Sequence, residues 1–192
     1  MLFISAGVYL FWHVKFISLP GSKNNPLVFQ SKLSPSLQEV VSRVEVANKS
    51  AVATGWKTYH PKNLEFTFNY PGGLLLQDTQ NGINIYADTS ENRAYIQNPN
   101  GYEGSRPGMF IVAIGSNQVP ESYAKQNFSG QEYVSTSLFW QKAIVLTGQG
   151  MDRWDVIIFT HNNMLYKISI QYGAPNDEMR TNYYKILSSF SF

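Results

Sequence analysis

The side chains best suited to catalysis or metal binding are widely spaced along this chain. Its three histidines, His13, His60 and His161, are isolated from one another in the sequence. Only Asp152, Asp155 and His161 fall close together, where a hairpin would bring two carboxylates near an imidazole. Such a cluster suits metal binding or proton transfer. The polarity of an ordinary turn and sheet edge explains the same residues, so we expect no metal site.

Other sequence signatures of catalysis are missing or incomplete. There is no G-x-S-x-G motif for a serine hydrolase, and there is no cysteine for a disulfide, a thiolate metal site or a thiol nucleophile. The segment Gly148-Gln149-Gly150 begins like a dinucleotide-binding loop. The third glycine is absent and a strand is expected to follow, so a phosphate would find no helix N-terminus. We expect a protein that is not an enzyme and has no cofactor, with a hydrolase assembled from distant residues as the alternative.

The most distinctive irregular segment is 93–108, which is rich in turn-forming dipeptides such as Asn98-Pro99. It carries Tyr95, Tyr102 and Arg106, residue types that often anchor protein interfaces. We therefore expect a partner-binding loop here. The alternative is an ordinary hairpin excursion whose tyrosines cover the sheet edge.

Composition describes a folded, aromatic-rich domain with weak overall charge. The chain has 192 residues, of which 43% are hydrophobic, 15% aromatic and 15% charged, and its net charge is +2. That length allows one domain and an appendage. Five basic and two acidic residues precede Trp56, whereas ten basic and eleven acidic residues follow from it onward. Because the main body has no basic cluster to neutralise phosphates, we expect no nucleic-acid partner.

The N-terminal residues 1–20 predict a membrane anchor. Leu2–Trp12 is uncharged and mostly apolar, Val14–Leu19 continues the pattern, and Pro20 ends it. Lys15 does not oppose this interpretation, because a lysine near the end of a span reaches the interface. A signal peptide and a buried element of the domain are the alternatives. An anchor here makes the membrane a partner and places the protein in the cell envelope, on the extracytoplasmic side.

Residues 21–55 resemble a linker, and within them 36–48 favours a short amphipathic helix. Ser36 and Glu39 have the spacing of a capping box, and apolar residues follow at helical intervals: Leu37, Val40, Val41 and Val44. The apolar stripe is narrow. Such a helix packs on the domain, lies on a membrane surface or stays loose, and a partly ordered spacer is the expectation.

The main body, residues 56–192, shows the patterns of several strands. Leu64–Tyr70 alternates strictly between apolar and polar residues, and Pro71 ends it. Asn162-Asn163 lies between two apolar runs and predicts a tight hairpin. The remaining strands are expected at Ile83–Tyr86, Met109–Ile114, Phe139–Thr147, Trp154–His161 and Met164–Tyr172.

Two helices complete the pattern. The last begins after Asn176, a good N-cap, and has one apolar face: Met179, Tyr183, Ile186, Leu187 and Phe190. Since Tyr183 and Tyr184 are adjacent, we expect at least one of them to face solvent. A shorter helix is expected at Pro120-Glu121. Strands in long runs with helices at separate points predict an α+β fold, an antiparallel sheet flanked by helices.

The order of these pieces resembles the Mog1/PsbP-like fold. The motifs that carry the resemblance follow one another from about Trp56 to Phe192, namely Tyr59-His60-Pro61, Leu64–Pro71, Pro120–Tyr123, Leu146–Gly150, Tyr166–Ile170 and Ile186–Phe192. The chain lacks the N-terminal cysteine of the lipoprotein relatives and the tryptophan that often follows Tyr-Pro. The resemblance implies a small extracytoplasmic domain that binds a protein or a ligand, with an accessory subunit of a membrane complex as an alternative. It transfers no functional residue.

Overall fold

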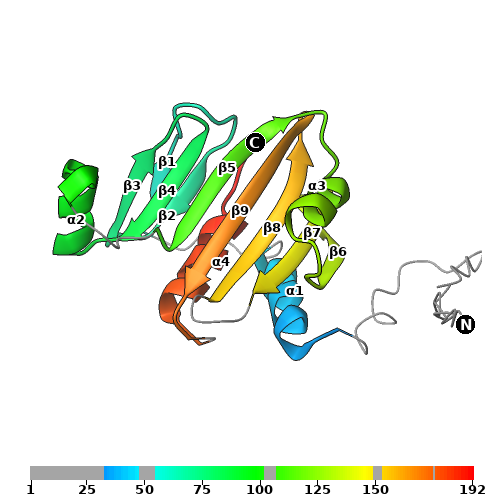
Figure 1. Cartoon of the computed structure of the whole chain (residues 1–192). Coiled ribbons are helices and arrows are strands. Elements are labelled where there is room, and N and C mark those ends of the chain that lie inside the picture. Colours follow the sequence, from blue (N-terminus) through cyan, green and yellow to red (C-terminus); the bar gives the residue numbers. More distant parts are fainter. Residues whose placement is uncertain (1–32, 48–54, 102–106, 149–152, 175) are drawn as a thin grey trace, which may run out of the picture. The chain divides into compact units, whose positions relative to one another are not determined.

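A computed structural model describes residues 33–47, 55–101, 107–148, 153–174 and 176–192. They belong to one compact unit, Leu33–Phe192. Its described part combines four α-helices with a seven-stranded sheet and a two-stranded ribbon (Figure 1). The elements are α1 Pro35–Ala47, β1 Lys57–Tyr59, β2 Phe68–Tyr70, β3 Leu74–Asp78, β4 Gly82–Ala87, α2 Ser90–Gln97, a 3-10 turn Pro99–Gly101, β5 Met109–Ser116, α3 Pro120–Asn127, β6 Tyr133–Leu138, β7 Gln141–Gly148, β8 Arg153–His161, β9 Met164–Tyr172 and α4 Glu178–Ser188.

The large sheet is antiparallel throughout and has the strand order β3-β4-β5-β9-β8-β7-β6. Its centre is the long hairpin β8–β9, which turns at Asn162-Asn163 with both residues at positive φ, 46° and 62°. Asparagine tolerates this left-handed conformation, which the tightest hairpin turns require. The predicted hairpin is therefore confirmed.

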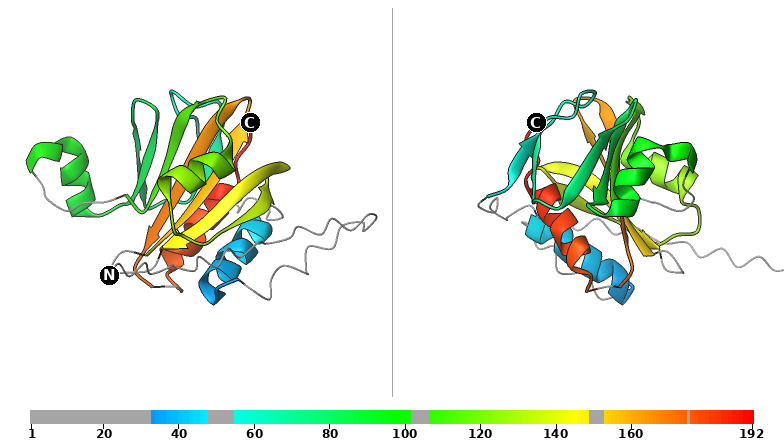
Figure 2. Two further views of the ribbon diagram at one scale, coloured as in Figure 1. Left: turned by 45° about the vertical axis from the view of Figure 1, so that its right-hand side comes forward. Right: turned by 90° about the vertical axis from the view of Figure 1, so that its left-hand side faces the viewer.

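Both faces of the sheet carry other elements. Helices α1 and α4 and the β1–β2 ribbon cover one face, and α3 covers part of the other (Figures 1 and 2). Alternation along β9 supplies both layers, since Tyr166, Ile168 and Ile170 join the first core and Leu165 joins the second. The predicted α+β fold with a flanked antiparallel sheet is confirmed at this level. The expected apolar helix at residues 1–20 lies outside the described residues.

Two expected strands differ in extent from the structure. Within Leu64–Tyr70 only Phe68–Tyr70 pairs with β1, while Thr67 bridges to Ser191 at the chain end. The expected strand at Phe139–Thr147 begins at Gln141 instead, because Phe139 and Trp140 form the turn from β6. The sequence pattern identified the buried faces, and tertiary pairing set the strand limits.

Both edge strands of the sheet escaped the sequence analysis. Strand β3 follows a glycine pair as a short leucine run, and β6 is rich in serine and threonine. An edge strand has one neighbour and a half-exposed face, so its hydrophobic signal is weak.

Helix α1 forms within one residue of its predicted position and packs on the sheet. Leu37, Val40, Val41 and Val44 are all buried, so its narrow apolar stripe belongs to the main core. Of the three placements considered, the structure shows packing on the domain. The predicted capping box differs from the helix start, because α1 begins at Pro35 and Ser36 lies within it. The Glu39 carboxylate pairs with Arg43 and Arg180.

Helix α4 corrects two further expectations. Asp177, not Asn176, is its N-cap, and its Oδ1 accepts a hydrogen bond from the Met179 amide at 2.9 Å. Tyr183 and Tyr184 are both buried. Both rings are covered because α4 contacts the sheet on one side and α1 on another.

Candidate functional site

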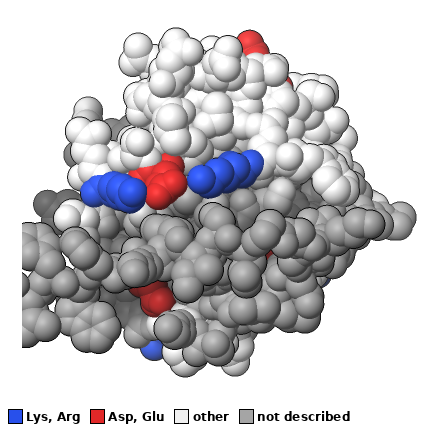
Figure 3. Space-filling model, turned by 90° about the vertical axis from the view of Figure 1, so that its right-hand side faces the viewer, with Lys and Arg blue, Asp and Glu red and all other residues white. Residues whose placement is uncertain are grey.

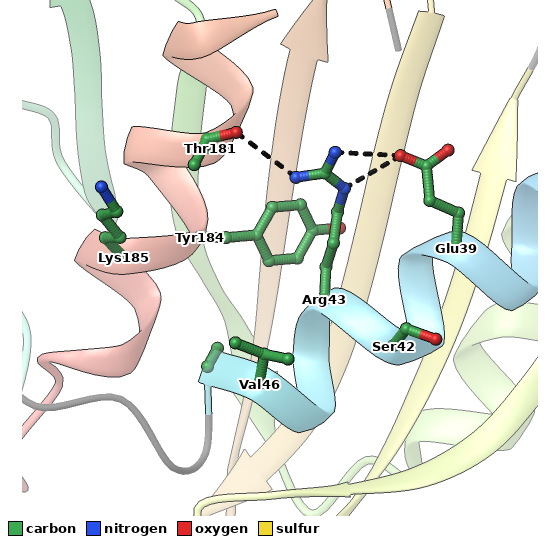
Figure 4. A pocket seen from close by; sticks show the side chains of 8 residues that line it. Glu39, Ser42, Arg43, Val46, Thr181, Tyr184 and Lys185 are labelled. Atoms are coloured by element: carbon green, nitrogen blue, oxygen red, sulfur yellow. Dashed lines mark hydrogen bonds and ion pairs between the residues drawn. The ribbon is translucent and has the colours of Figure 1, made fainter. Parts of the chain in front are cut away.

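A groove of about 410 Å³ lies between α1 and α4 (Figure 4). Its lining comes from both helices: Glu39, Ser42, Arg43, Val46 and Ala47 from α1, and Thr181, Tyr184 and Lys185 from α4. On each helix these residues are three or four positions apart, so they project from one face. The volume is within the usual range for a small-molecule site, about 300–1,000 Å³.

An ion pair along α1 and a hydrogen bond to α4 lie in the groove. The Glu39 carboxylate pairs with Arg43, one helical turn along α1, at 3.0 Å. The Arg43 guanidinium also donates to Thr181 Oγ1 on α4, at 3.4 Å. Figure 4 shows these contacts across the groove. They fix the distance between the helices at this level.

Beneath this layer lies Arg180, whose side chain is only 1% exposed. One of its nitrogens, Nη1, donates to Glu39 Oε1 at 2.9 Å. Its Nε and Nη2 reach Asp155 Oδ2 on β8, at 2.9 and 2.8 Å. Arg180 therefore links a half-exposed carboxylate in the groove to a carboxylate in the core.

Asp155 is fully buried and has a full set of hydrogen bonds. Its Oδ2 accepts from Arg180 and the Tyr184 hydroxyl, and its Oδ1 accepts from the Thr147 and Tyr172 hydroxyls, at 2.8–3.0 Å. Burial raises the pKa of this carboxyl, while the Arg180 charge and the hydrogen bonds act in the opposite direction. A carboxylate offers about four acceptor sites, and the donors around Asp155 occupy them. Its hydrogen bonds to Arg180 and Tyr184 hold α4 on the sheet.

Aromatic rings surround the buried guanidinium. Arg180 lies over the Tyr172 ring, with its Cζ 4.0 Å from the ring centroid. Tyr184 directs its hydroxyl at Asp155 while its ring lines the groove. Burial raises the pKa of the Tyr184 hydroxyl well above its ordinary value, and the Asp155 charge adds to the rise. Tyr184 thus connects the groove to the buried ion pair.

The chemical character of the groove follows from these ion pairs and hydrogen bonds. Arg43, Glu39, Arg180 and Asp155 form one connected chain of alternating charge. Lys185 contributes an exposed ammonium that has no ion-pair partner among the described residues. The apolar part of the lining is Val46, Ala47 and the Tyr184 ring. The groove offers an apolar surface next to a positive charge.

The residues expected to bind a partner are only partly visible. Tyr95 lies on α2, half-buried, with its ring centroid 6.1 Å from that of Tyr86. Tyr102 and Arg106 lie outside the described residues. The prediction of an irregular segment at 93–108 is partly wrong, because residues 93–97 belong to α2. That helix is capped by Thr89, whose hydroxyl accepts from the Asn92 amide at 3.1 Å.

The cluster considered for Asp155 and His161, and not favoured, does not form. Both lie on β8, six residues apart, which separates them by about 20 Å. His161 instead hydrogen-bonds Gln141 at 2.8 Å and stacks on Phe192. Asp152 lies outside the described residues. We expected Asp155 to be a polar residue of a turn or sheet edge. That expectation is wrong, because Asp155 is buried in the core.

The sequence carries local signals for some of the residues that build the groove and none for others. The Glu39–Arg43 spacing was a usable signal, since it is that of a helical ion pair. Asp155 also had a signal, a lone carboxylate in the otherwise apolar run Trp154–Phe159. A buried charge needs a partner, but no local pattern identifies Arg180, which is 25 residues away.

Comparisons with protein-family models and with curated proteins give no match. Among solved structures, the chain is similar to a crystal structure from Bacteroides thetaiotaomicron, with 13% identity and a TM-score of 0.46. The similarity covers 70% of this chain and 47% of the other, so this chain spans about half of that protein. It is also similar to the solution structure of cyanobacterial PsbP (CyanoP) from Synechocystis sp. PCC 6803. Here the identity is 10%, the TM-score 0.44, and the coverage 74% and 96%. Neither value establishes a shared family or a function.

The predicted anchor, residues 1–20, lies outside the described residues. None of the helices in the described ranges has the length and apolarity that a membrane span needs.

Proposed function

We propose that this protein is a membrane-tethered, extracytoplasmic domain of the PsbP-related kind that binds a ligand in the α1–α4 groove and is not an enzyme. The observation that carries the proposal is the ionic chain from Arg43 through Glu39 and Arg180 to Asp155. It fixes both walls of the groove to the sheet. The order of motifs from Tyr59 to Phe192 supports the relationship to PsbP, and the apolar residues 1–20 support the tether.

A fixed groove favours binding because its walls need no ordering when a ligand arrives. The four charged residues of the chain bind one another, and their contacts, at 2.8–3.0 Å, leave the groove with a stable shape. Buried Asp155 and Arg180 lie below the lining and hold it in place. This arrangement suits recognition of a ligand by shape.

The lining indicates the class of ligand. Val46 offers exposed apolar contact above the buried Ala47 and Tyr184, and the Lys185 ammonium lies at the exposed side. A small molecule with an apolar body and one negative charge satisfies both features. The ligand class we propose is therefore a small apolar carboxylate.

Phenylacetate is a suitable probe, and the neutral phenylacetamide is its matched control. We expect phenylacetate titrated into the full chain in detergent micelles to shift the backbone amide resonances of α1 and α4. Lys185→Glu should weaken binding about five- to tenfold, since it reverses one exposed charge. Ser42→Trp should abolish it by filling the groove.

Lys62→Glu is the control variant, because Lys62 is exposed and does not line the groove. It should leave the affinity unchanged. Resonance shifts outside α1 and α4 would show that the groove is not the binding site. Equally large shifts with phenylacetamide, or with phenylacetate added to the Lys185→Glu variant, would contradict the proposed recognition of a carboxylate by Lys185.

A further inference from the structure

Large exposed apolar side chains gather at one end of the sheet. Among the described residues four are prominent: Val46 at 62% exposed, Val119 at 57%, Trp140 at 99% and Phe192 at 40%. Val46 belongs to the groove. Trp140 forms the turn between β6 and β7, Val119 precedes α3, and Phe192 ends the chain.

Contacts place these three residues at the same end of the sheet, with Val119 on the α3 face and Phe192 on the opposite face. Lys142, two residues after Trp140, reaches Glu121 Oε2 at 3.4 Å, and Glu121 is two residues after Val119. Phe192 stacks on His161, with ring centroids 4.0 Å apart, and His161 hydrogen-bonds Gln141 beside the turn. We call this end of the sheet, with Val119, Trp140 and Phe192, the apolar tip.

The turn at the apolar tip is strained. Phe139 and Trp140 have φ angles of 51° and 64°, a conformation that glycine and asparagine adopt readily. For bulky residues such a position is strained. Phe139 offsets its strain by stacking on Phe190 at 5.6 Å. Trp140 is almost fully exposed, so packing within the described body does not offset its strain.

We infer that the apolar tip contacts the interfacial layer of a lipid bilayer, with Trp140 as the inserted side chain; this inference rests on the proposed membrane tether. Tryptophan combines a large apolar ring with one N–H donor, and therefore favours the boundary between lipid and water. Lys125 and Lys142, both paired with Glu121, lie next to the tip at headgroup depth.

The distribution of charge supports a lipid surface as the occupant. Figure 3 shows the side that carries α3, β6 and β7, where charged side chains form a short row. The described surface above that row is nearly uncharged. Inserting such a surface into the interface desolvates few charges, which keeps the cost of insertion low.

The tether has sufficient reach for this contact. Twelve residues, 21–32, separate the predicted anchor from the compact unit, and they span at most about 40 Å. The unit begins beside β6, where the Ser34 amide donates to Glu132 at 3.3 Å. Trp140 lies at the other end of that six-residue strand, about 20 Å away. A tethered body meets the bilayer at high effective concentration, so a weak contact is populated.

The test uses the full chain reconstituted into phosphatidylcholine vesicles, with and without brominated lipid. Flotation of the vesicles reports the tether, and quenching of tryptophan emission by the brominated lipid reports insertion. Trp12 lies in the predicted anchor and would itself be quenched, so the comparison is made in a Trp12→Phe background. We expect that chain to float and to show a blue-shifted, quenched component that Trp140→Ser removes. Val119→Ser should reduce the quenching, and Lys62→Ser, at an exposed position outside both the groove and the apolar tip, should leave it unchanged.

The outcomes separate the two proposals. A chain that fails to float lacks the tether, and the inference falls with it. A chain that floats while Trp140 stays open to aqueous acrylamide keeps the tether and overturns the inference. If a photoreactive residue at position 140 cross-links a protein instead of lipid in cell envelopes, the apolar tip is a protein interface.

Discussion

Asp155 is the residue on which the position of α4 depends. It sits in the central hairpin strand β8, and five donors reach its two oxygens. Replacing one partner of a buried ion pair leaves the other charge without compensation, which is the expensive outcome. Tyr172 contributes a single neutral hydroxyl at 3.0 Å, so its removal is a smaller change to the same carboxylate.

Arg180→Leu should lower the free energy of unfolding by about 3–5 kcal/mol, because Asp155 stays buried and loses its cation. Tyr172→Phe removes one hydrogen bond and should cost about 1 kcal/mol. Urea denaturation of both variants followed by circular dichroism measures the difference. Equal losses in the two variants would mean that Asp155 does not carry a buried charge.

At the scale of elements, α1 belongs to the folded body. Its buried side chains join the main core beside α4, β6 and β7. Its exposed side chains supply one wall of the groove. Helix α1 therefore connects the stability of the domain to the shape of the candidate site.

Leu37→Ala should lower the free energy of unfolding by about 2–5 kcal/mol, as a fully buried leucine in a core does. Val46→Ala, on the exposed face of the same helix, should change it by less than about 0.5 kcal/mol. Thermal and urea unfolding of the two variants provide the comparison. A negligible effect of Leu37→Ala would make α1 a loose spacer.

At the scale of the whole molecule, tyrosine ionisation makes the fold sensitive to alkali. Burial raises the pKa of seven described tyrosines, to about 12 for Tyr59 and Tyr183. In the unfolded chain these hydroxyls lose their protons near pH 10. Above that pH the folded state binds more protons than the unfolded state, so stability falls as pH rises.

We expect the free energy of unfolding to be constant with respect to these tyrosines below pH 9 and to decline between about pH 10 and pH 12. Tyr183→Phe should make the decline shallower, since it removes one such group. Denaturation across this range, with phenolate absorbance near 295 nm as a second reading, measures both. A flat profile would show that the hydroxyls titrate normally.

The local elements of this protein follow from short-range sequence patterns. The spacing of hydrophobic residues predicted α1, the β8–β9 hairpin and the buried face of α4. Each of these features depends on residues only a few positions apart. The sequence also shows the apolar segment 1–20 and contains no cysteine. These features need no knowledge of distant contacts.

The candidate site depends on long-range packing. Arg180 lies 141 residues after Glu39 and 25 residues after Asp155. The pairing of these three side chains depends on how α1 and α4 pack on β8. The same holds for Tyr184, whose burial follows from contacts on two sides of α4, and for the apolar tip, where a turn, a loop and the chain end meet. Local sequence specifies the face of each element, whereas long-range packing specifies which faces meet.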